Sequence, residues 1–208
     1  MPILELDHLV LGATSLAAGT PALATLLGVE PEPGGRHEGA GTHNRLLSLG
    51  PQTYLELIAP DPGQPTPPRP RPFGLDAPAV IERVTQRPRL LAYVVRTDDI
   101  AAARAALGLP AGRIIDMRRG ELQWRISLPV AGQPAGTPIL IEWGDSPNPS
   151  SSLPDRGLRL LDLRIGVPAA TARLLAPLAD DGRIRVEAAD AVELAARIDT
   201  PAGAVELD

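Results

Sequence analysis

The stretch ELDHLVLG (residues 5–12) places one histidine in a run of aliphatic residues near the start of the chain. Its alternation predicts a β-strand with two faces, one carrying Leu4, Leu6, His8 and Val10, the other Leu9 and Leu11. An imidazole on an apolar strand face has two interpretations. It is a core side chain with a satisfied hydrogen bond, or it points into a cavity and binds something there.

The composition excludes several classes of function. The chain has 208 residues, 44% of them hydrophobic, and a net charge of −5, so it lacks the basic face that a nucleic-acid partner needs. We find no apolar run long enough for a membrane span and no basic leader, and we expect a cytoplasmic protein. Because the chain has no cysteine, thiolate metal sites and cysteine nucleophiles are excluded. Aromatic residues make up only 2%, so the core must be aliphatic.

The chain divides into three similar segments. After the strand at residues 3–11, a helix is expected at 14–28, capped by Thr14 or Ser15 and ended by Gly28, and strands follow in NRLLSLG and TYLELIAP. The same order returns after residue 89. We therefore expect a first βαβββ unit at 1–59, a second at 89–146, and a partial third β-α-β unit at 155–208.

The connection between the first two units, residues 60–88, begins with a proline-rich segment. Residues 60–78 contain eight prolines in nineteen positions. Proline has no backbone N–H to donate, so this segment cannot form a central strand and should run over the surface. It serves either as a linker or as a lid.

Two positions align between the first two units. Placing HLVLGATSLAAG over AYVVRTDDIAAA matches His8 with Ala92, a shift of 92 − 8 = 84. Placing YLELIAPD over LIEWGD matches Glu56 with Glu142, a shift of 142 − 56 = 86. The agreement of the two shifts to within two residues indicates an internal repeat.

With the repeat in view, the chain resembles the vicinal oxygen chelate superfamily, in its glyoxalase-like branch. The resemblance is carried by LDHLVLGATSL, GRHEGAGTHN, TYLELIAPDP and ILIEWGD, and covers roughly residues 3–145. It implies an α+β fold in which paired βαβββ repeats form curved mixed sheets around a cavity. A third partial repeat at the C-terminus packs against them, or completes a sheet with the partner chain of a homodimer.

In that superfamily the metal ligands come from the first and last strands of each unit. The corresponding residues here are His8, Glu56, Ala92 and Glu142, and Ala92 cannot coordinate a metal. The resemblance therefore implies one divalent ion, of unspecified identity, on His8, Glu56 and Glu142, with Glu56 or Glu142 as general base. Such a site would serve a lyase, an isomerase or a dioxygenase acting on a small oxygen-rich substrate.

The alternative is a metal-free small-molecule binding protein, similar to the resistance or sequestration proteins of the superfamily. Glu56 and Glu142 would then need partners such as Arg125 or Arg45, since an unpaired buried carboxylate is costly. A third reading is a scaffold whose third unit fills the cavity.

Further ligand contacts are expected at the entrance of the cavity. The loop RHEGAGTHN carries His37 and His43, and His43 enters the next strand beside Asn44. We predict His43, Asn44 and Arg125 as substrate-binding residues, while a solvated loop histidine is an equal interpretation for His37. Trp124 and Trp143 are expected in the core or the cavity wall, with Trp143 on the face opposite Glu142.

Overall fold

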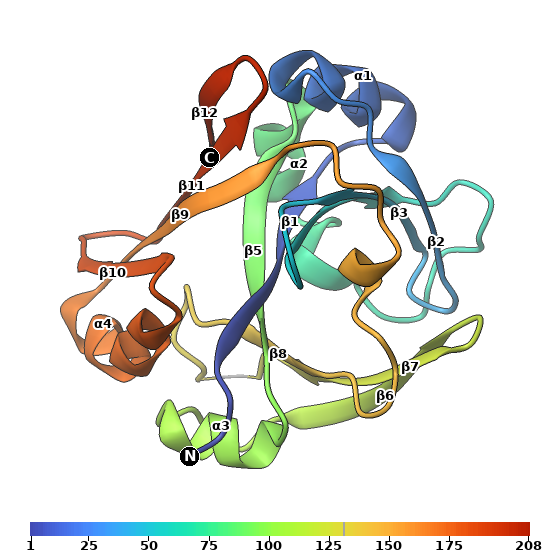
Figure 1. The fold of residues 1–208 in the computed structure, drawn as a ribbon. Coiled ribbons are helices and arrows are strands. Elements are labelled where there is room, and N and C mark those ends of the chain that lie inside the picture. The colour runs from blue at the N-terminus through green and yellow to red at the C-terminus, as the bar shows by residue number, and fades with distance from the viewer. Residues whose placement is uncertain (131) are drawn as a thin grey trace.

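The computed structural model describes residues 1–130 and 132–208, which form two β-sheets and four α-helices (Figure 1). The large sheet has eight strands in the order β2-β3-β4-β1-β5-β8-β7-β6, and the small sheet has four in the order β10-β9-β11-β12. The large sheet curls into a half-barrel, as the resemblance implied. In the described part of the chain, no helix is long and apolar enough to cross a membrane.

The first unit supplies half of the large sheet. Its elements are β1 (Glu5–Gly12), α1 (Leu16–Leu27), β2 (Glu32–His37), β3 (Thr42–Ser48) and β4 (Tyr54–Pro60). Helix α1 starts at Ser15, whose side chain accepts from the Ala18 backbone N–H at 3.1 Å, and ends at Gly28 in the left-handed conformation. Because β4 returns to lie parallel to β1, His8 lies beside Tyr54 in the register.

The second unit has the same connectivity. Its elements are β5 (Arg89–Arg96), α3 (Ile100–Ala106), β6 (Arg113–Arg119), β7 (Leu122–Leu128) and β8 (Ile139–Glu142), and β8 is parallel to β5. The units join through antiparallel pairing of β1 with β5 at the centre of the sheet, where Val10 lies opposite Ala92. At the far edges β2 comes close to β6: a Cβ on Gly35 would meet the Arg119 side chain at 2.6 Å.

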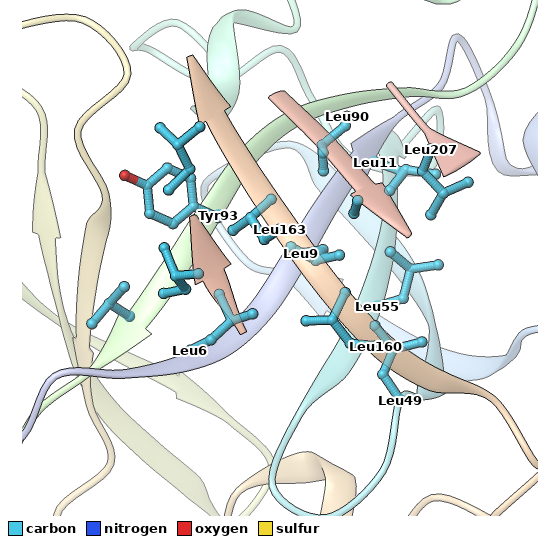
Figure 2. Packing of buried hydrophobic residues seen from close by; sticks show 14 of the residues in the cluster. Leu6, Leu9, Leu11, Leu49, Leu55, Leu90, Tyr93, Leu160, Leu163 and Leu207 are labelled. Carbon is cyan, nitrogen blue, oxygen red and sulfur yellow. The ribbon is translucent and has the colours of Figure 1, made fainter. Parts of the chain in front are cut away.

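Strand β1 contains a β-bulge that the alternation pattern does not reveal. Its register with β5 shifts between Leu6 and His8, so Asp7 is the extra residue. The bulge reverses the alternation, and Leu6 joins the same core cluster as Leu9 and Leu11 instead of the face of His8 (Figure 2). The predicted grouping of Leu6 with His8 was therefore wrong, and its cause is this one inserted residue.

The proline-rich segment carries a short 3₁₀ turn (Pro72–Gly74) and leads into α2 (Pro78–Thr85). It is fastened to the start of β3. The Asp61 backbone N–H and the Arg71 Nε donate to the Gly41 carbonyl at 3.0 and 2.9 Å, and the Gln64 amide donates to the Thr42 carbonyl at 3.1 Å.

The C-terminal residues form the second sheet from β9 (Arg159–Val167), α4 (Ala169–Leu175), β10 (Ile184–Ala188), β11 (Glu193–Thr200) and β12 (Gly203–Leu207). Its topology differs from that of the first two units. Strand β9 pairs in parallel with β10, the strand directly after the helix, whereas β1 and β5 pair in parallel with the last strand of their units.

The main core lies between the two sheets. Figure 2 shows β9 crossing over β1 and β5, with Leu160 and Leu163 packed among Leu6, Leu9 and Leu55. The second sheet therefore covers the convex face of the half-barrel, and the concave face stays open to hold a cavity.

Candidate active site

A cavity of about 330 Å³ lies on the concave face of the large sheet. Such a volume is at the lower end of the range for small-molecule sites. Both units and the proline-rich segment line it. Its apolar wall includes Ile58, Phe73, Met117, Trp124, Ile126 and Trp143, and its polar side chains include His8, His37, Asn44, Glu56, Arg69 and Arg119.

His8 is held in one orientation by its neighbour Asp7. The Asp7 Oδ1 lies 2.6 Å from the His8 Nδ1, a contact between adjacent residues that the bulge in β1 allows. Asp7 is fully buried, and its Oδ2 accepts from the Trp143 indole N–H at 2.9 Å and the Asn148 amide at 2.7 Å. Since Asp7 is the acceptor in these contacts, His8 Nδ1 carries a hydrogen and Nε2 is left to face the cavity.

Tyr54 supports the imidazole from the next strand. The two rings stack with centroids 4.4 Å apart and an interplanar angle of 18°. Burial raises the pKa of the Tyr54 phenol well above its usual value, and the nearby Asp7 and Glu56 carboxylates raise that pKa further. The phenol therefore stays protonated and acts as a neutral support.

Glu56 is the acidic group on the cavity floor. It is only 5% exposed, and its Oε1 accepts from the Asn44 amide at 2.6 Å. Its Oε2 lies 3.6 Å from the His8 Nε2. The site thus contains two buried, proton-accepting atoms side by side, each oriented by a hydrogen bond on the far side of its own group.

His37 completes the group as a neutral acceptor. Its Nδ1 lies 2.9 Å from the Thr42 hydroxyl, and its Nε2 lies 3.3 Å from the Asn44 amide nitrogen, which has one hydrogen for Glu56 and one for His37. Burial lowers the pKa of His37, with Arg119 acting in the same direction and Glu56 opposing both. His37 was expected in a loop; it is instead the last residue of β2, packed into the cavity wall, and helps to hold Asn44.

Two arginines face the cavity. Arg119 comes from the end of β6, and its Nη1 lies 3.4 Å from the Asn44 Oδ1, which also accepts from the Gly35 backbone N–H at 2.8 Å. Arg69 comes from the proline-rich segment and is exposed. Strand alternation in RIIDMRR places Ile115, Met117 and Arg119 on one face, and this pattern could have indicated Arg119 from the sequence.

Of the residues expected at the site, His8, Glu56 and Asn44 come together in the cavity. His43 does not line it: it lies on the other face of β3 from Asn44, and its Nδ1 is 3.8 Å from Asp61 Oδ1. The sequence reasoning missed Asp7, Phe73 and Arg119 and left His37 undecided. Asp7 was hidden because strand neighbours normally point to opposite faces.

Glu142 and Arg125 lie elsewhere. They form an ion pair with each other and line an adjacent hollow, which shares Met117, Trp124 and Trp143 with the cavity. The register explains this placement. Val10 pairs with Glu56, and its counterpart at the shift of 84, Val94, pairs with Ile139. Ile139 thus corresponds to Glu56, and Glu142, three residues later, falls on the opposite face, while Ile141 and Trp143 face the cavity.

The residues do not fit the metal that the resemblance implied. Glu142 is turned away from His8 and Glu56, and Ala92 has no donor atom. Throughout residues 1–130 and 132–208, no three His, Asp or Glu side chains gather in an arrangement that could hold a metal ion. The chemistry of this cavity is therefore derived below from its side chains alone.

Comparison with known proteins gives a family and a fold. The family model described as "Glyoxalase-like domain" matches residues 6–179. No curated protein matches the chain. Among solved structures, a hypothetical protein from Staphylococcus aureus is 14% identical with a TM-score of 0.61, covering 92% of this chain and 88% of that one.

Two epimerases are also similar at lower scores. A methylmalonyl-CoA epimerase in complex with methylmalonyl-CoA and NH4+ is 20% identical, with a TM-score of 0.47 and coverage of 70% of this chain and 99% of that one. The Mycobacterium tuberculosis methylmalonyl-CoA epimerase is 16% identical, with a TM-score of 0.43 and coverage of 71% and 91%. At these levels the structural comparisons concern the fold and leave the activity to be argued from the cavity.

Proposed function

The chain belongs to the family of glyoxalase-like domains, and from this premise we propose that its concave cavity is the active site of an isomerase or lyase that moves a proton on a small carbonyl compound. The observation that carries the proposal is the pair His8 Nε2 and Glu56 Oε2, buried and 3.6 Å apart. Within the described residues, neither atom has another hydrogen-bond partner. Two such atoms can accept and return a proton.

The proposed step uses Glu56 as general base. Its Oε2 takes a proton from the carbon next to the substrate carbonyl, and the electron pair of the broken C–H bond moves to the carbonyl oxygen to form an enolate. Arg119 is the cation beside Asn44 and Glu56, and its N–H groups would stabilise the negative charge on that oxygen.

The second half of the step uses His8. The proton that Glu56 has taken passes from its Oε2 to the His8 Nε2, 3.6 Å away, and the imidazolium delivers it from the same side to another carbon conjugated with the enolate, which gives an isomer. Alternatively, the enolate electron pair expels a β-substituent and gives an elimination product. Asp7 acts as a positioning residue, because it fixes the imidazole through Nδ1 and stabilises the imidazolium that forms when Nε2 is protonated.

Hydrogen exchange into the substrate tests this proposal. The protein is incubated in D2O with a panel of 2-oxo and 3-oxo acids, and loss of the C–H signal next to the carbonyl is followed by NMR. We expect wild-type protein to accelerate the exchange, and Glu56→Gln and His8→Gln each to slow it by about 10²–10⁴-fold. Glu142→Gln is the matched control, since that carboxylate lies outside the cavity, and it should exchange at the wild-type rate.

A metal-free binding protein is the second candidate, and the mainly apolar cavity wall favours it. The same panel of oxo acids distinguishes a binding protein from the proposed enzyme. A compound that saturates the cavity while its exchange stays at the rate of buffer would identify a binding protein and contradict the enzyme.

A further inference from the structure

Aromatic side chains are concentrated at this one cavity. The chain has one Phe, two Trp and two Tyr, five in all. Four of the five line the cavity, namely Tyr54, Phe73, Trp124 and Trp143, while the main core between the sheets consists of aliphatic residues and Tyr93. Packing alone does not demand this distribution, because Leu, Ile and Val fill the rest of the protein. The distribution therefore indicates a ligand with an aromatic face.

The backbone at Phe73 adopts a conformation that bulky residues rarely take, which indicates that the surroundings fix the position of its ring. Phe73 is one of two non-glycine residues with positive φ in the described chain, at φ 58° and ψ 17°. A bulky residue in this region costs about 1–3 kcal/mol and persists only where the surroundings fix it. Its ring packs against the same buried cluster as Trp124 and Trp143, whose ring centroids are 5.4 Å apart.

The two arginines of the cavity lack acidic partners. In residues 1–130 and 132–208, no carboxylate lies within 4.0 Å of the Arg69 or Arg119 guanidinium, whereas Arg125, one strand away from Arg119, is paired with Glu142. Arg119 is half-buried with only the 3.4 Å contact to Asn44, so most of its donors are unused. A guanidinium in this state suits a carboxylate, which it can bind through two parallel hydrogen bonds.

From these observations we propose that the ligand of the cavity is a small carboxylic acid carrying an aromatic ring, with the ring against Phe73, Trp124 and Trp143 and the carboxylate on Arg119. The inference rests on the proposed function, since it assigns the substrate class of the same site. Asn44 bridges Arg119 and Glu56 at 3.4 and 2.6 Å, so the carboxylate and the reacting carbon would lie close together in the ligand.

A cationic ligand is the main alternative to a carboxylate ligand. Aromatic rings beside a carboxylate also bind quaternary ammonium groups, and Glu56 and the exposed Glu38 both line the cavity. However, the Glu56 Oε1 is already bonded to Asn44, and the two arginines would repel a cation. The two arginines and two glutamates of the lining balance in charge, so the preference for an anion rests on the unused donors of Arg119, whereas Glu56 already has Asn44 as a partner.

Binding of three matched probes tests the inference. 3-Phenylpropanoate, its neutral amide and phenylpropyl-trimethylammonium share one ring and differ in charge. Both tryptophans of the chain line the cavity, so their fluorescence reports occupancy directly. We expect the carboxylate to bind about tenfold or more tightly than the amide and the ammonium to bind more weakly still. Hexanoate, which lacks the ring, should bind more weakly than 3-phenylpropanoate.

Two variants locate the selectivity. Arg119→Gln should bring the carboxylate-to-amide ratio close to one, while the matched control Arg125→Gln, in the hollow outside the cavity, should leave it unchanged. Equal binding of the three probes, tighter binding of the ammonium, binding of none, or selectivity that survives Arg119→Gln would each overturn the inference.

These measurements need no turnover, so the two ideas fail separately. Carboxylate selectivity without hydrogen exchange on any acid would remove the proposed enzyme and leave the ligand class standing. Exchange on the oxo acids without carboxylate selectivity among the three probes would do the reverse.

Discussion

At the scale of single residues, the site depends on side chains that cannot move independently. Asn44 holds Glu56 and His37 with its amide nitrogen and accepts from Arg119 and Gly35 with its oxygen. Asp7 similarly holds His8, Trp143 and Asn148. Buried polar groups of this kind are oriented because each lost partner would leave a costly unpaired atom.

Asp7→Asn is the sharpest test of positioning. The amide retains the shape but no longer stabilises an imidazolium at His8, so we expect exchange to fall by about a hundredfold or more. The acidic limb of the pH–rate profile should also move, which a merely structural defect would not produce. Far-UV circular dichroism checks folding, and an unchanged rate and pH profile would show that Asp7 does not act through His8.

His37 gives a pH dependence of stability. Its pKa is lowered in the folded protein, mainly by burial. As the pH falls below about 6.5, the unfolded chain binds a proton at His37 that the folded chain does not, so stability decreases; the loss levels off below the folded pKa. Urea midpoints at pH 7.5 and 5.5 should therefore differ more for wild type than for His37→Gln, whose amide can still accept from Asn44. Identical pH dependence in the two proteins would contradict this account.

At the scale of elements, the proline-rich segment covers part of the cavity, to which it contributes Arg69 and Phe73. Its attachment depends on Arg71, which bonds the Gly41 carbonyl and pairs with Asp76. The sequence left linker and lid open as alternatives, and the segment lies at the cavity because Arg69, Pro70, Pro72 and Phe73 line it.

Arg71→Ala should loosen this segment. We expect faster amide hydrogen exchange across residues 61–77 and several-fold weaker binding of 3-phenylpropanoate, because the free protein would no longer hold Phe73 in place. Arg83→Ala, on the neighbouring helix α2, provides the comparison. If both variants exchange and bind as wild type does, Arg71 does not secure the cover.

The elements also show how far sequence reasoning reaches. Alternation and helix caps were enough for the strand–helix–strand order, since it depends on local pattern. The expectation that His8 and Glu56 meet in one cavity came from the internal repeat and the family resemblance, and Asn44 was expected from its position at the start of a strand after the glycine-rich loop. Three features depend on the register between strands and could not be predicted from the sequence. They are the bulge at Asp7, the correspondence of Ile139 with Glu56, and the parallel pairing of β9 with β10. A shift of one residue reverses the face, so Glu142 was expected in the cavity and lies outside it.

At the scale of the whole molecule, both sheets share one core. Leucines of β1 and β4 pack against leucines of β9 (Figure 2). The backbone carbonyl of Asp208 accepts from the Leu90 backbone N–H at 2.8 Å. Removing either sheet would expose the apolar face of the other, which couples their stability.

We therefore expect one cooperative unfolding transition. Tryptophan fluorescence reports the second unit, and far-UV circular dichroism reports both sheets, so their urea curves should coincide. Leu163→Ala, at a fully buried position in the second sheet, should shift both curves together and lower the free energy of unfolding by about 2–5 kcal/mol. Separated curves would show that the sheets unfold independently.

The pairing of His8 with Ala92 and of Glu56 with Ile139 in the repeat has one more consequence. The first unit carries the proton-carrying groups His8 and Glu56. The second unit supplies apolar wall residues of the cavity and, through the Trp143 indole N–H, a hydrogen bond to Asp7. The second half therefore has two neutral positions in the apolar cluster of the concave face, a buried Ile139 and a partly buried Ala92, where the first half carries Glu56 and His8. New catalytic side chains could therefore be introduced at these two positions without replacing His8 or Glu56.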